Sequence, residues 1–342
     1  MKKGRTGPRS RSDLFDSLHD DIVISILCKL SSTASSPSDL IAVQLTCKRL
    51  NKLGVHPLVL SKSCSGILAV GAKNWCGDAH RFLKLCVNSG KTEAYYTLGM
   101  IRFYCLQNRA SGASMMAKAA IKSYAPALYS LAIIQFNGSG ALKNDKDLHA
   151  GAALCVRAAY LGHIDALREL GHCLQDGYGV RKNVAEGRRL LVQANARELV
   201  SVLRAQALNK AGLGNEMYSD YGVNVTGGDQ LHPASRFLVE WFGSRENELS
   251  GQGLRMCCYK GCGRPETRRN EFRRCSGCGK VYYCSRACQA RDWRVHHKVE
   301  CAPMEGWAGH AIDDVDEGNR NGEDDVIRDR TVDIEEREID EI

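Results

Sequence analysis

Hydrophobic positions near the start of the chain recur at helical spacing and form two apolar stripes. The first stripe consists of Leu18, Ile22, Ile26 and Leu30. The second follows a stretch rich in Ser and Pro at 31–38, ends near Gly54 and Pro57, and consists of Leu40, Val43, Cys47 and Leu50. Residues four apart share one face of a helix. The pattern therefore predicts a helical hairpin within residues 14–64, with an apolar side that must be covered.

Between residues 94 and 194 the pattern repeats with an offset of 39 residues. The matching segments are Ala119-Ala120 with Ala158-Ala159, Leu131 with Leu170, and Gly138-Ser139-Gly140 with Gly177-Tyr178-Gly179. An earlier, weaker copy includes Leu98-Gly99. Each copy has the pattern of a helix, a Gly-rich turn and a second helix, a unit too small to bury its own faces. Such units stack, so residues 65–200 are predicted to form an α-solenoid. Residues 201–256 are predicted to be a linker that contains a short helix at 233–242.

Composition places the molecule among globular proteins with charged tails. Hydrophobic residues make up 44% of the 342 residues, which is enough for several cores. Residues 313–342 contain fourteen acidic residues against four arginines, and residues 1–12 contain five basic residues and no acid. We expect residues 1–13 and 302–342 to be disordered, because they have too little apolar surface to offset chain entropy. The basic first residues could also be a nuclear import signal.

The predicted location of the protein is the nucleus, the cytoplasm or both. No run of 18 apolar residues predicts a membrane span, and no apolar segment follows Met1 as in a secretory signal. In such a reducing compartment the sixteen cysteines are not a disulfide framework. The eight cysteines before residue 257 are interpreted as small buried hydrophobic residues.

The other eight cysteines lie between residues 257 and 301, in closely spaced groups. The groups are Cys257-Cys258 with Cys262, Cys275 with Cys278, Cys284 with Cys288, and His296-His297 with Cys301. Paired thiolates and an imidazole are the ligands of tetrahedral Zn²⁺, and eight ligands would close two sites with no open position. Forty-five residues with few large aliphatic side chains cannot form a sufficient core. Two structural zinc ions would therefore supply the folding energy, about 10–16 kcal/mol each.

The order and spacing of these ligands resemble the MYND zinc finger over residues 257–301. By that likeness one ion is held by Cys257, Cys262, Cys284 and Cys288, and the other by Cys275, Cys278, His297 and Cys301. Cys258 and His296 are the alternatives to their neighbours Cys257 and His297. Fingers of this family typically bind short proline-containing peptides, and Gln289 and Trp293 match positions of that groove.

The finger is basic, with twelve Lys/Arg against four Asp/Glu in residues 255–301. Nucleic acid binding is one explanation of such charge. The other is that a four-thiolate zinc site carries a charge of −2 and a three-thiolate site −1, which arginines nearby would offset. Candidates for that role are Arg268, Arg269, Arg273 and Arg274. No aromatic platform or recognition helix is evident, so nucleic acid is not the predicted partner.

Residues 14–64 resemble an F-box, from the pattern Leu18-His19-Asp20-Asp21-Ile22 through Leu45 to Leu50. In F-box proteins such a helix pair docks on the Skp adaptor of cullin-based ubiquitin ligases. The likeness makes the apolar side chains of the first helix the adaptor-binding residues: Leu18, Ile22, Ile26, Leu27 and Leu30. The alternative is an ordinary helical hairpin that packs on the solenoid. The repeats resemble SEL-type, tetratricopeptide-related repeats, which scaffold protein complexes.

The fold prediction is therefore a mainly α chain: an F-box, an α-solenoid and a two-zinc finger. The layout resembles a family of plant F-box proteins, which implies a non-catalytic adaptor that presents substrate proteins to a ubiquitin ligase. The alternative is a transcriptional or chromatin adaptor that acts through the finger without a ligase. MYND fingers also occur in lysine methyltransferases, but the sequence contains no cofactor-binding motif of that class, no phosphate-binding loop and no HExxH or Gly-x-Ser-x-Gly motif.

Overall fold

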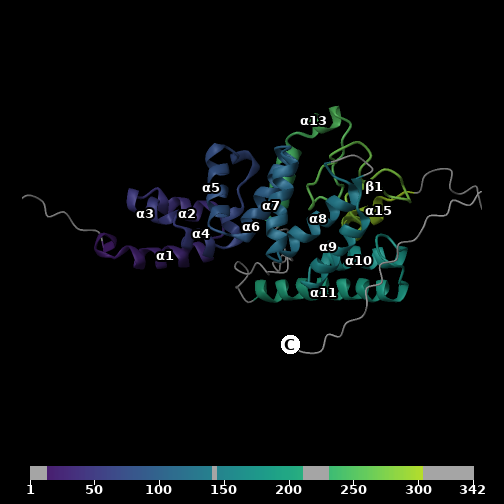
Figure 1. Cartoon of the computed structure of the whole chain (residues 1–342), viewed down its shortest axis with the longest axis horizontal. Coiled ribbons are helices and arrows are strands. Elements are labelled where there is room, and N and C mark those ends of the chain that lie inside the picture. The colour runs from purple at the N-terminus through teal and green to yellow at the C-terminus, as the bar shows by residue number, and fades with distance from the viewer. Residues whose placement is uncertain (1–13, 141–144, 211–230, 303–342) are drawn as a thin grey trace, which may run out of the picture. The chain divides into compact units, whose positions relative to one another are not determined.

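The computed structural model describes residues 14–140, 145–210 and 231–302. The predicted basic and acidic tails and the Gly-rich stretch at 211–230 lie outside these residues. The described part is mainly α-helical, as the sequence predicts, with one two-stranded sheet (Figure 1). No helix in the described ranges is long and apolar enough to span a membrane.

The N-terminal region contains four helices. The helices are α1 (Asp20–Thr33), α2 (Pro37–Gln44), α3 (Lys48–Gly54) and α4 (Pro57–Lys62). A 3-10 turn, η1 (Leu14–Ser17), precedes them. The second apolar stripe is thus divided between α2 and α3, because Cys47 caps α3 and its Sγ accepts a hydrogen bond from the Leu50 amide. Arg49 ties η1 and the start of α1 to α3, since its guanidinium pairs with Asp20 and donates to the Phe15 carbonyl.

Three helical hairpins stack in the middle of the chain. They follow the 3-10 turns η2 (Ser65–Leu68) and η3 (Ala72–Asn74) and the helix α5 (Gly77–Asn88). The hairpins are α6 (Thr92–Met100) with α7 (Arg109–Ile121), α8 (Ala125–Asn137) with α9 (Leu148–Tyr160), and α10 (Ile164–Asp176) with α11 (Val184–Lys210); a π-helical turn, η4 (Ile101–Cys105), follows α6. Gly138 and Gly177 end α8 and α10 in the left-handed conformation, with φ of 62° and 74°, which explains the repeated Gly-x-Gly. Contacts between successive hairpins bury a continuous core.

The segment predicted as a linker contributes to the core. α12 (Pro233–Gly243) buries Phe237 and Leu238 and packs on α6, η3 and η4, near the start of the repeats. The Trp75 and Phe237 rings meet edge to face with centroids 5.2 Å apart, and the Ala72 amide donates to Glu240 Oε2 at 2.9 Å. The short helix predicted at 233–242 is therefore present, but it packs on the repeats and is not part of a free linker. α13 (Glu246–Gly251) then leads to the cysteine-rich region.

The eight cysteines before residue 257 differ in burial. Three are buried and three partly buried: Cys86, Cys155 and Cys173, and Cys28, Cys64 and Cys105. Burial raises the pKa of the Cys86 thiol to about 12. Cys47 and Cys76 are exposed, so the interpretation as buried hydrophobic residues is wrong for these two. Cys76 precedes the first residue of α5, at a helix start rather than on an inward face.

Replacing Gly112 by Ala should destabilise the repeats. A Cβ there would lie 2.6 Å from the Phe103 amide nitrogen and 2.7 Å from the Gly99 carbonyl, so α6 and α7 would have to move apart. Overpacking of this kind costs about 1–3 kcal/mol. The measurement is the free energy of unfolding in urea. Gly77→Ala is the matched control, because a Cβ at Gly77 meets no atom within 4 Å. Equal stability of both variants would contradict the close helix contact.

Candidate metal centres

The cysteine-rich region is organised by a short hairpin and a helical end. β1 (Arg273–Arg274) pairs antiparallel with β2 (Tyr282–Tyr283), and the turn between them carries Cys275 and Cys278. Cys284 follows β2 directly. Ser285 caps α14 (Arg286–Asp292), since its Oγ accepts from the Cys288 amide at 3.0 Å. A π-helical turn, η6 (Trp293–His297), and α15 (Lys298–Glu300) complete the region. Each segment thus brings two ligands close together.

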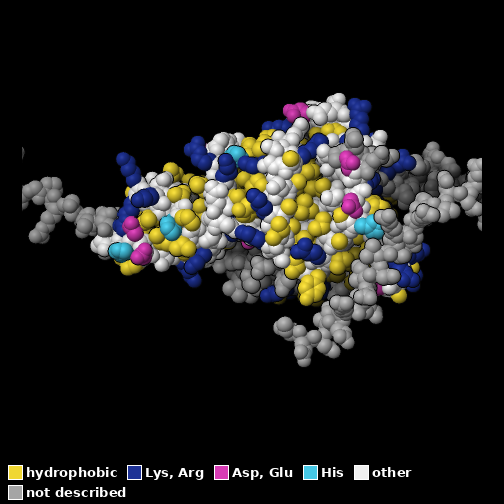
Figure 2. Space-filling model, viewed as in Figure 1, with side chains coloured by type: hydrophobic (Ala, Val, Ile, Leu, Met, Phe, Trp, Pro, Cys, Tyr) yellow, Lys and Arg dark blue, Asp and Glu magenta, His cyan; other side chains and the backbone are white. Residues whose placement is uncertain are grey.

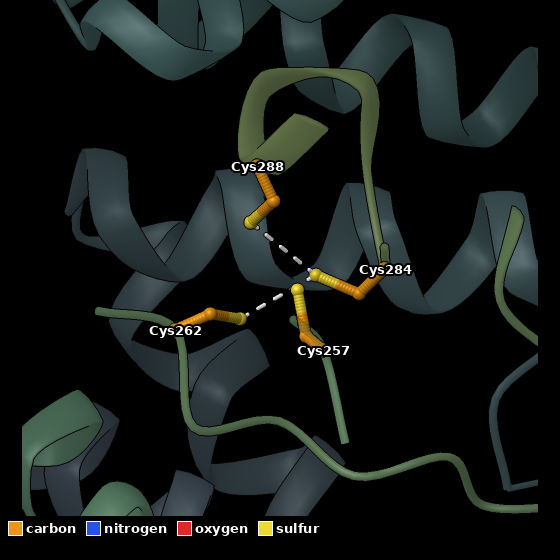
Figure 3. Close-up of side chains that lie close together, drawn as sticks. All are labelled: Cys257, Cys262, Cys284 and Cys288. Atoms are coloured by element: carbon orange, nitrogen blue, oxygen red, sulfur yellow. Dashed lines mark hydrogen bonds between the residues drawn. The ribbon is translucent and has the colours of Figure 1, made fainter. Parts of the chain in front are cut away.

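Four buried thiols form the first cluster. Cys257, Cys262, Cys284 and Cys288 direct their sulfur atoms toward one another (Figure 3), all within 4.8 Å. The Sγ–Sγ distances are 3.5 Å for Cys262–Cys284 and 3.6 Å for Cys284–Cys288. Thiolates bound tetrahedrally to zinc at 2.3 Å would be about 3.8 Å apart. The donor set and its spacing therefore fit one structural zinc ion.

Three thiols and one imidazole form the second cluster, from Cys275, Cys278, His297 and Cys301. Sγ of Cys275 and Cys301 are 4.0 Å apart, and His297 Nε2 is 3.5 Å from Cys278 Sγ. This set fits a second structural zinc ion with four protein ligands and no open position. Zinc at both centres would supply folding energy and electrostatic neutralisation of the thiolates.

The two alternative ligands lie outside both clusters. Cys258 Sγ accepts a hydrogen bond from the Tyr282 amide at 3.3 Å, and the Cys258 amide donates to the Tyr282 carbonyl. His296 Nδ1 faces Glu300 at 3.3 Å on an exposed side. The structure thus brings together the two sets that the family likeness groups, with Cys257 and His297 as members.

A buried arginine faces the first cluster. Arg264 Nη1 lies 3.6 Å from Cys262 Sγ and 4.0 Å from Cys284 Sγ, and Nη2 donates to Ser130 Oγ of α8 at 2.8 Å. Burial alone would lower the pKa of Arg264, but attraction to the Cys262 and Cys284 thiolates outweighs this and raises it. Arg264 therefore offsets thiolate charge and links the cluster to the repeats.

The four arginines named as candidates for that role do not contact the ligand sulfurs directly, and their part in offsetting the charge stays a prediction. None of them has a hydrogen bond to a ligand sulfur among the described residues. Arg268 donates to the Asn137 carbonyl at 2.5 Å and Arg269 to the Gln252 carbonyl at 3.0 Å, while Arg273 and Arg274 are exposed on β1. Arg264, two residues after Cys262, was missed by the sequence analysis. Its closeness to a ligand in the sequence was the one available signal.

Basic residues of the finger pair with acidic residues of the repeats. Arg286 lies 2.6 Å from Asp176, Arg291 lies 2.7 Å from Asp165, and Arg294 pairs with Glu198. The amide of Ala287, in the first turn of α14, donates to the buried Glu169 at 3.1 Å, and Asn137 Nδ2 donates to the Cys284 carbonyl at 2.9 Å. Part of the positive charge that suggested nucleic acid binding is therefore paired with acidic residues of the same chain.

The predicted peptide-binding residues lie on the helical end of the finger. Gln289 is half-buried on α14, and Trp293 is 39% exposed at the start of η6. The Trp293 and His297 rings are 5.8 Å apart, so the tryptophan is held beside a ligand of the second cluster. Their role in peptide binding stays a prediction.

The predicted adaptor-binding residues do not share one face. Ile22 and Ile26 of α1 are 50% and 43% exposed, Leu18 and Leu30 are partly buried, and Leu27 is 2% exposed. Leu27 therefore corrects the sequence analysis: with Val23 it forms the inward face of α1 and cannot contact a partner there. Further apolar side chains, which the sequence pattern did not single out, are exposed on neighbouring elements: Phe15, Ile41 and Leu45. In Figure 2 hydrophobic side chains reach the surface of this region between charged ones.

Comparison with known proteins gives two family matches and close relatives. A model described as MYND finger matches residues 257–301, and one described as plant tetratrico peptide repeats matches residues 69–157. F-box protein At5g50450 of Arabidopsis thaliana is 63% identical over 304 residues, which cover 89% of this chain and 90% of that protein. F-box protein At1g67340 of the same plant is 59% identical over 334 residues, 91% of this chain and 88% of the relative.

Solved structures of repeat proteins resemble the chain more distantly. The antigen c5321 of uropathogenic Escherichia coli, which displays an SLR fold, matches with a TM-score of 0.39 and 12% identity, over 68% of this chain and 55% of that one. A Sel1 repeat protein from Oxalobacter formigenes matches with a TM-score of 0.35 and 15% identity, over 64% of this chain and 89% of that one.

The zinc content of variants should distinguish the ligands Cys257 and His297 from the adjacent Cys258 and His296. The purified chain should bind two zinc ions. Cys257→Ser should lower this to about one, because three ligands hold zinc far more weakly than four. Cys258→Ser is the matched control and should keep both ions. Likewise, His297→Ala should lose one zinc ion, and its matched control His296→Ala should keep both. The measurement is elemental analysis of the dialysed protein; equal zinc loss within a pair would contradict the assignment.

Removing the Arg264 charge should destabilise both the finger and its contact with the repeats. Arg264→Gln leaves buried thiolate charge without its counter-charge, which costs about 3–5 kcal/mol for comparable buried pairs. Unfolding in urea measures that cost, and a chelator titration should release one zinc at a lower chelator concentration. Arg274→Gln, at an exposed position on β1, should behave like the unmodified protein. Identical curves for the two variants would show that Arg264 has no electrostatic role.

Proposed function

The chain belongs to a family of plant F-box proteins, and it carries tetratricopeptide-type repeats and a MYND finger. From this premise we propose that it recruits substrates to an SCF-type cullin–RING ubiquitin ligase. In this role residues 14–64 bind a Skp-family adaptor, and the repeats and the finger bind the substrate. The chain itself carries out no chemistry. It raises the effective concentration of the substrate beside the ubiquitin-charged enzyme.

The exposed apolar pair on α1 is the observation that carries the proposal. Ile22 and Ile26 are four residues apart, so they lie on one side of the helix, and both remain about half exposed while Val23 and Leu27 fill the core. Helix-in-groove binding uses apolar anchors at this spacing. Phe15, Ile41 and Leu45 add apolar surface in the same N-terminal module.

The finger supports a binding role for its helical end. Arg286, Arg291 and Arg294 are engaged by the repeats, whereas Trp293 keeps an exposed edge. Gln289 and Trp293 are the residues that we propose contact a proline-containing segment of the substrate. Both zinc ions are structural in this proposal, and the protein acts in the nucleus, the cytoplasm or both.

Adaptor binding should depend on the α1 pair. Ile22→Asp with Ile26→Asp places two charges where apolar anchors would dock, so co-purification of a Skp-family adaptor and cullin should be lost. Both positions are solvent-accessible, so stability should change by less than about 1 kcal/mol.

Ile121→Asp with Tyr160→Asp is the matched control, because these side chains are also exposed but lie on the repeats. This variant should still bind the adaptor. If the unmodified chain fails to bind any Skp-family adaptor while it remains folded and zinc-loaded, the ligase role is wrong, and an adaptor that acts through the finger alone becomes the better explanation.

A further inference from the structure

The outer side of α11, the last helix of the repeats, is apolar. Val192, Leu199 and Leu203 are 68%, 59% and 54% exposed. Together with two exposed alanines, Ala196 and Ala207, these residues are spaced by four, three, four and four positions, which places them on one side of a helix. We call this set the outer stripe: Val192, Ala196, Leu199, Leu203 and Ala207. Val200 and Val202 are also exposed and widen it.

Folding of the described residues does not require the outer stripe. α11 packs on α10 through its opposite side, where Gly187, Leu190 and Ala194 are buried. A surface helix needs only one apolar stripe, and the end of a repeat stack ordinarily presents a polar outer face. A second stripe on this helix therefore indicates that another element covers it.

The charged residues of α11 that have no ion pair among the described residues are of one sign. Both carboxylates of α11 are already paired: Glu186 lies 2.6 Å from Arg189, and Glu198 pairs with Arg168 and Arg294. Four basic residues of α11 have no ion pair within the part of the chain that the structure describes: Arg188, Arg197, Arg204 and Lys210. The unpaired charge of this helix is therefore positive.

We propose that the outer stripe binds an amphipathic helix of a partner protein, with apolar residues at alternating spacings of three and four and with acidic residues beside them. Such a helix would stack on α11 as α11 stacks on α10, and its carboxylates would face the unpaired basic residues. A second copy of this chain fits less well, because two α11 helices would bring positive charges together. Describing the partner as a ubiquitination substrate rests on the proposed function, whereas the binding itself does not.

Two designed peptides test the proposal. Both are about 25 residues long, form helices and share one leucine stripe; one carries glutamates beside the stripe and the other lysines. Fluorescence anisotropy with the full, zinc-loaded chain should show the acidic peptide binding at least about tenfold more tightly, a difference of about 1.4 kcal/mol. Salt should weaken this preference.

Variants of α11 assign the binding to the outer stripe. Leu199→Asp with Leu203→Asp should weaken binding of the acidic peptide at least about tenfold, and Arg197→Glu with Arg204→Glu should favour the basic peptide instead. Val156→Asp with Tyr160→Asp, exposed apolar positions of α9, is the matched control and should bind normally. Circular dichroism and unchanged zinc content show that each variant is folded.

Three results would overturn the proposal. The first is absence of binding, or equal binding of both peptides. The second is a dimer in sedimentation experiments that dissociates in the Leu199→Asp, Leu203→Asp variant, which would assign the outer stripe to a second copy. The third is binding only after residues 303–342 are deleted, which would make the chain's own acidic segment the occupant. Adaptor binding through α1 is measured separately, so failure of one proposal does not affect the other.

Discussion

Negative charge on the zinc-bound thiolates is the constraint on which the arrangement of the finger and repeats depends. A four-thiolate site carries a charge of −2, and at the first cluster that charge is buried against α8. Burying charge is costly unless it is paired. Arg264 provides the pairing, and its second hydrogen bond anchors the guanidinium to Ser130 of the repeats. Arg264 consequently couples metal binding and folding of the finger to its docking on the repeats.

Charge pairing also explains how the basic finger packs on the repeats of the same chain. Asp165, Asp176 and Glu198 of the repeats each meet an arginine of α14 or η6, and Glu169 accepts from the amide of Ala287. Arg291 and Asp165 form a partly buried ion pair, in which attraction to Asp165 raises the pKa of Arg291 even though burial opposes it. The acidic residues of the repeats thus act as the binding site for the finger, while Trp293 remains 39% exposed.

Local features of this protein could be predicted from sequence, and long-range ones could not. Zinc ligands come in pairs no more than five residues apart, so Cys284 with Cys288 or His297 with Cys301 was recognisable without knowledge of the fold. The repeat was visible because Gly138 and Gly177 end equivalent helices. By contrast, Arg286 and Asp176 are 110 residues apart, and Ala72 and Glu240 are 168 apart. A single sequence does not indicate such pairs, which is why residues 201–256 were predicted to be a linker and the contacts between finger and repeats were not predicted.

The wrong prediction for Leu27 and the unpredicted outer stripe of α11 have the same physical origin. Periodicity shows that a helix has apolar sides, but not which side faces the core. α1 has two apolar sides, one with Val23 and Leu27 and the other with Ile22 and Ile26. The first is buried because α1 packs on α3 and α4, and the second stays exposed. α11 also has two apolar sides, and α10 covers the side with Leu190 and Ala194. A helix whose sequence is apolar on more sides than its own domain can cover is therefore a candidate for recognition, because the unburied stripe retains most of its hydrophobic free energy for a partner.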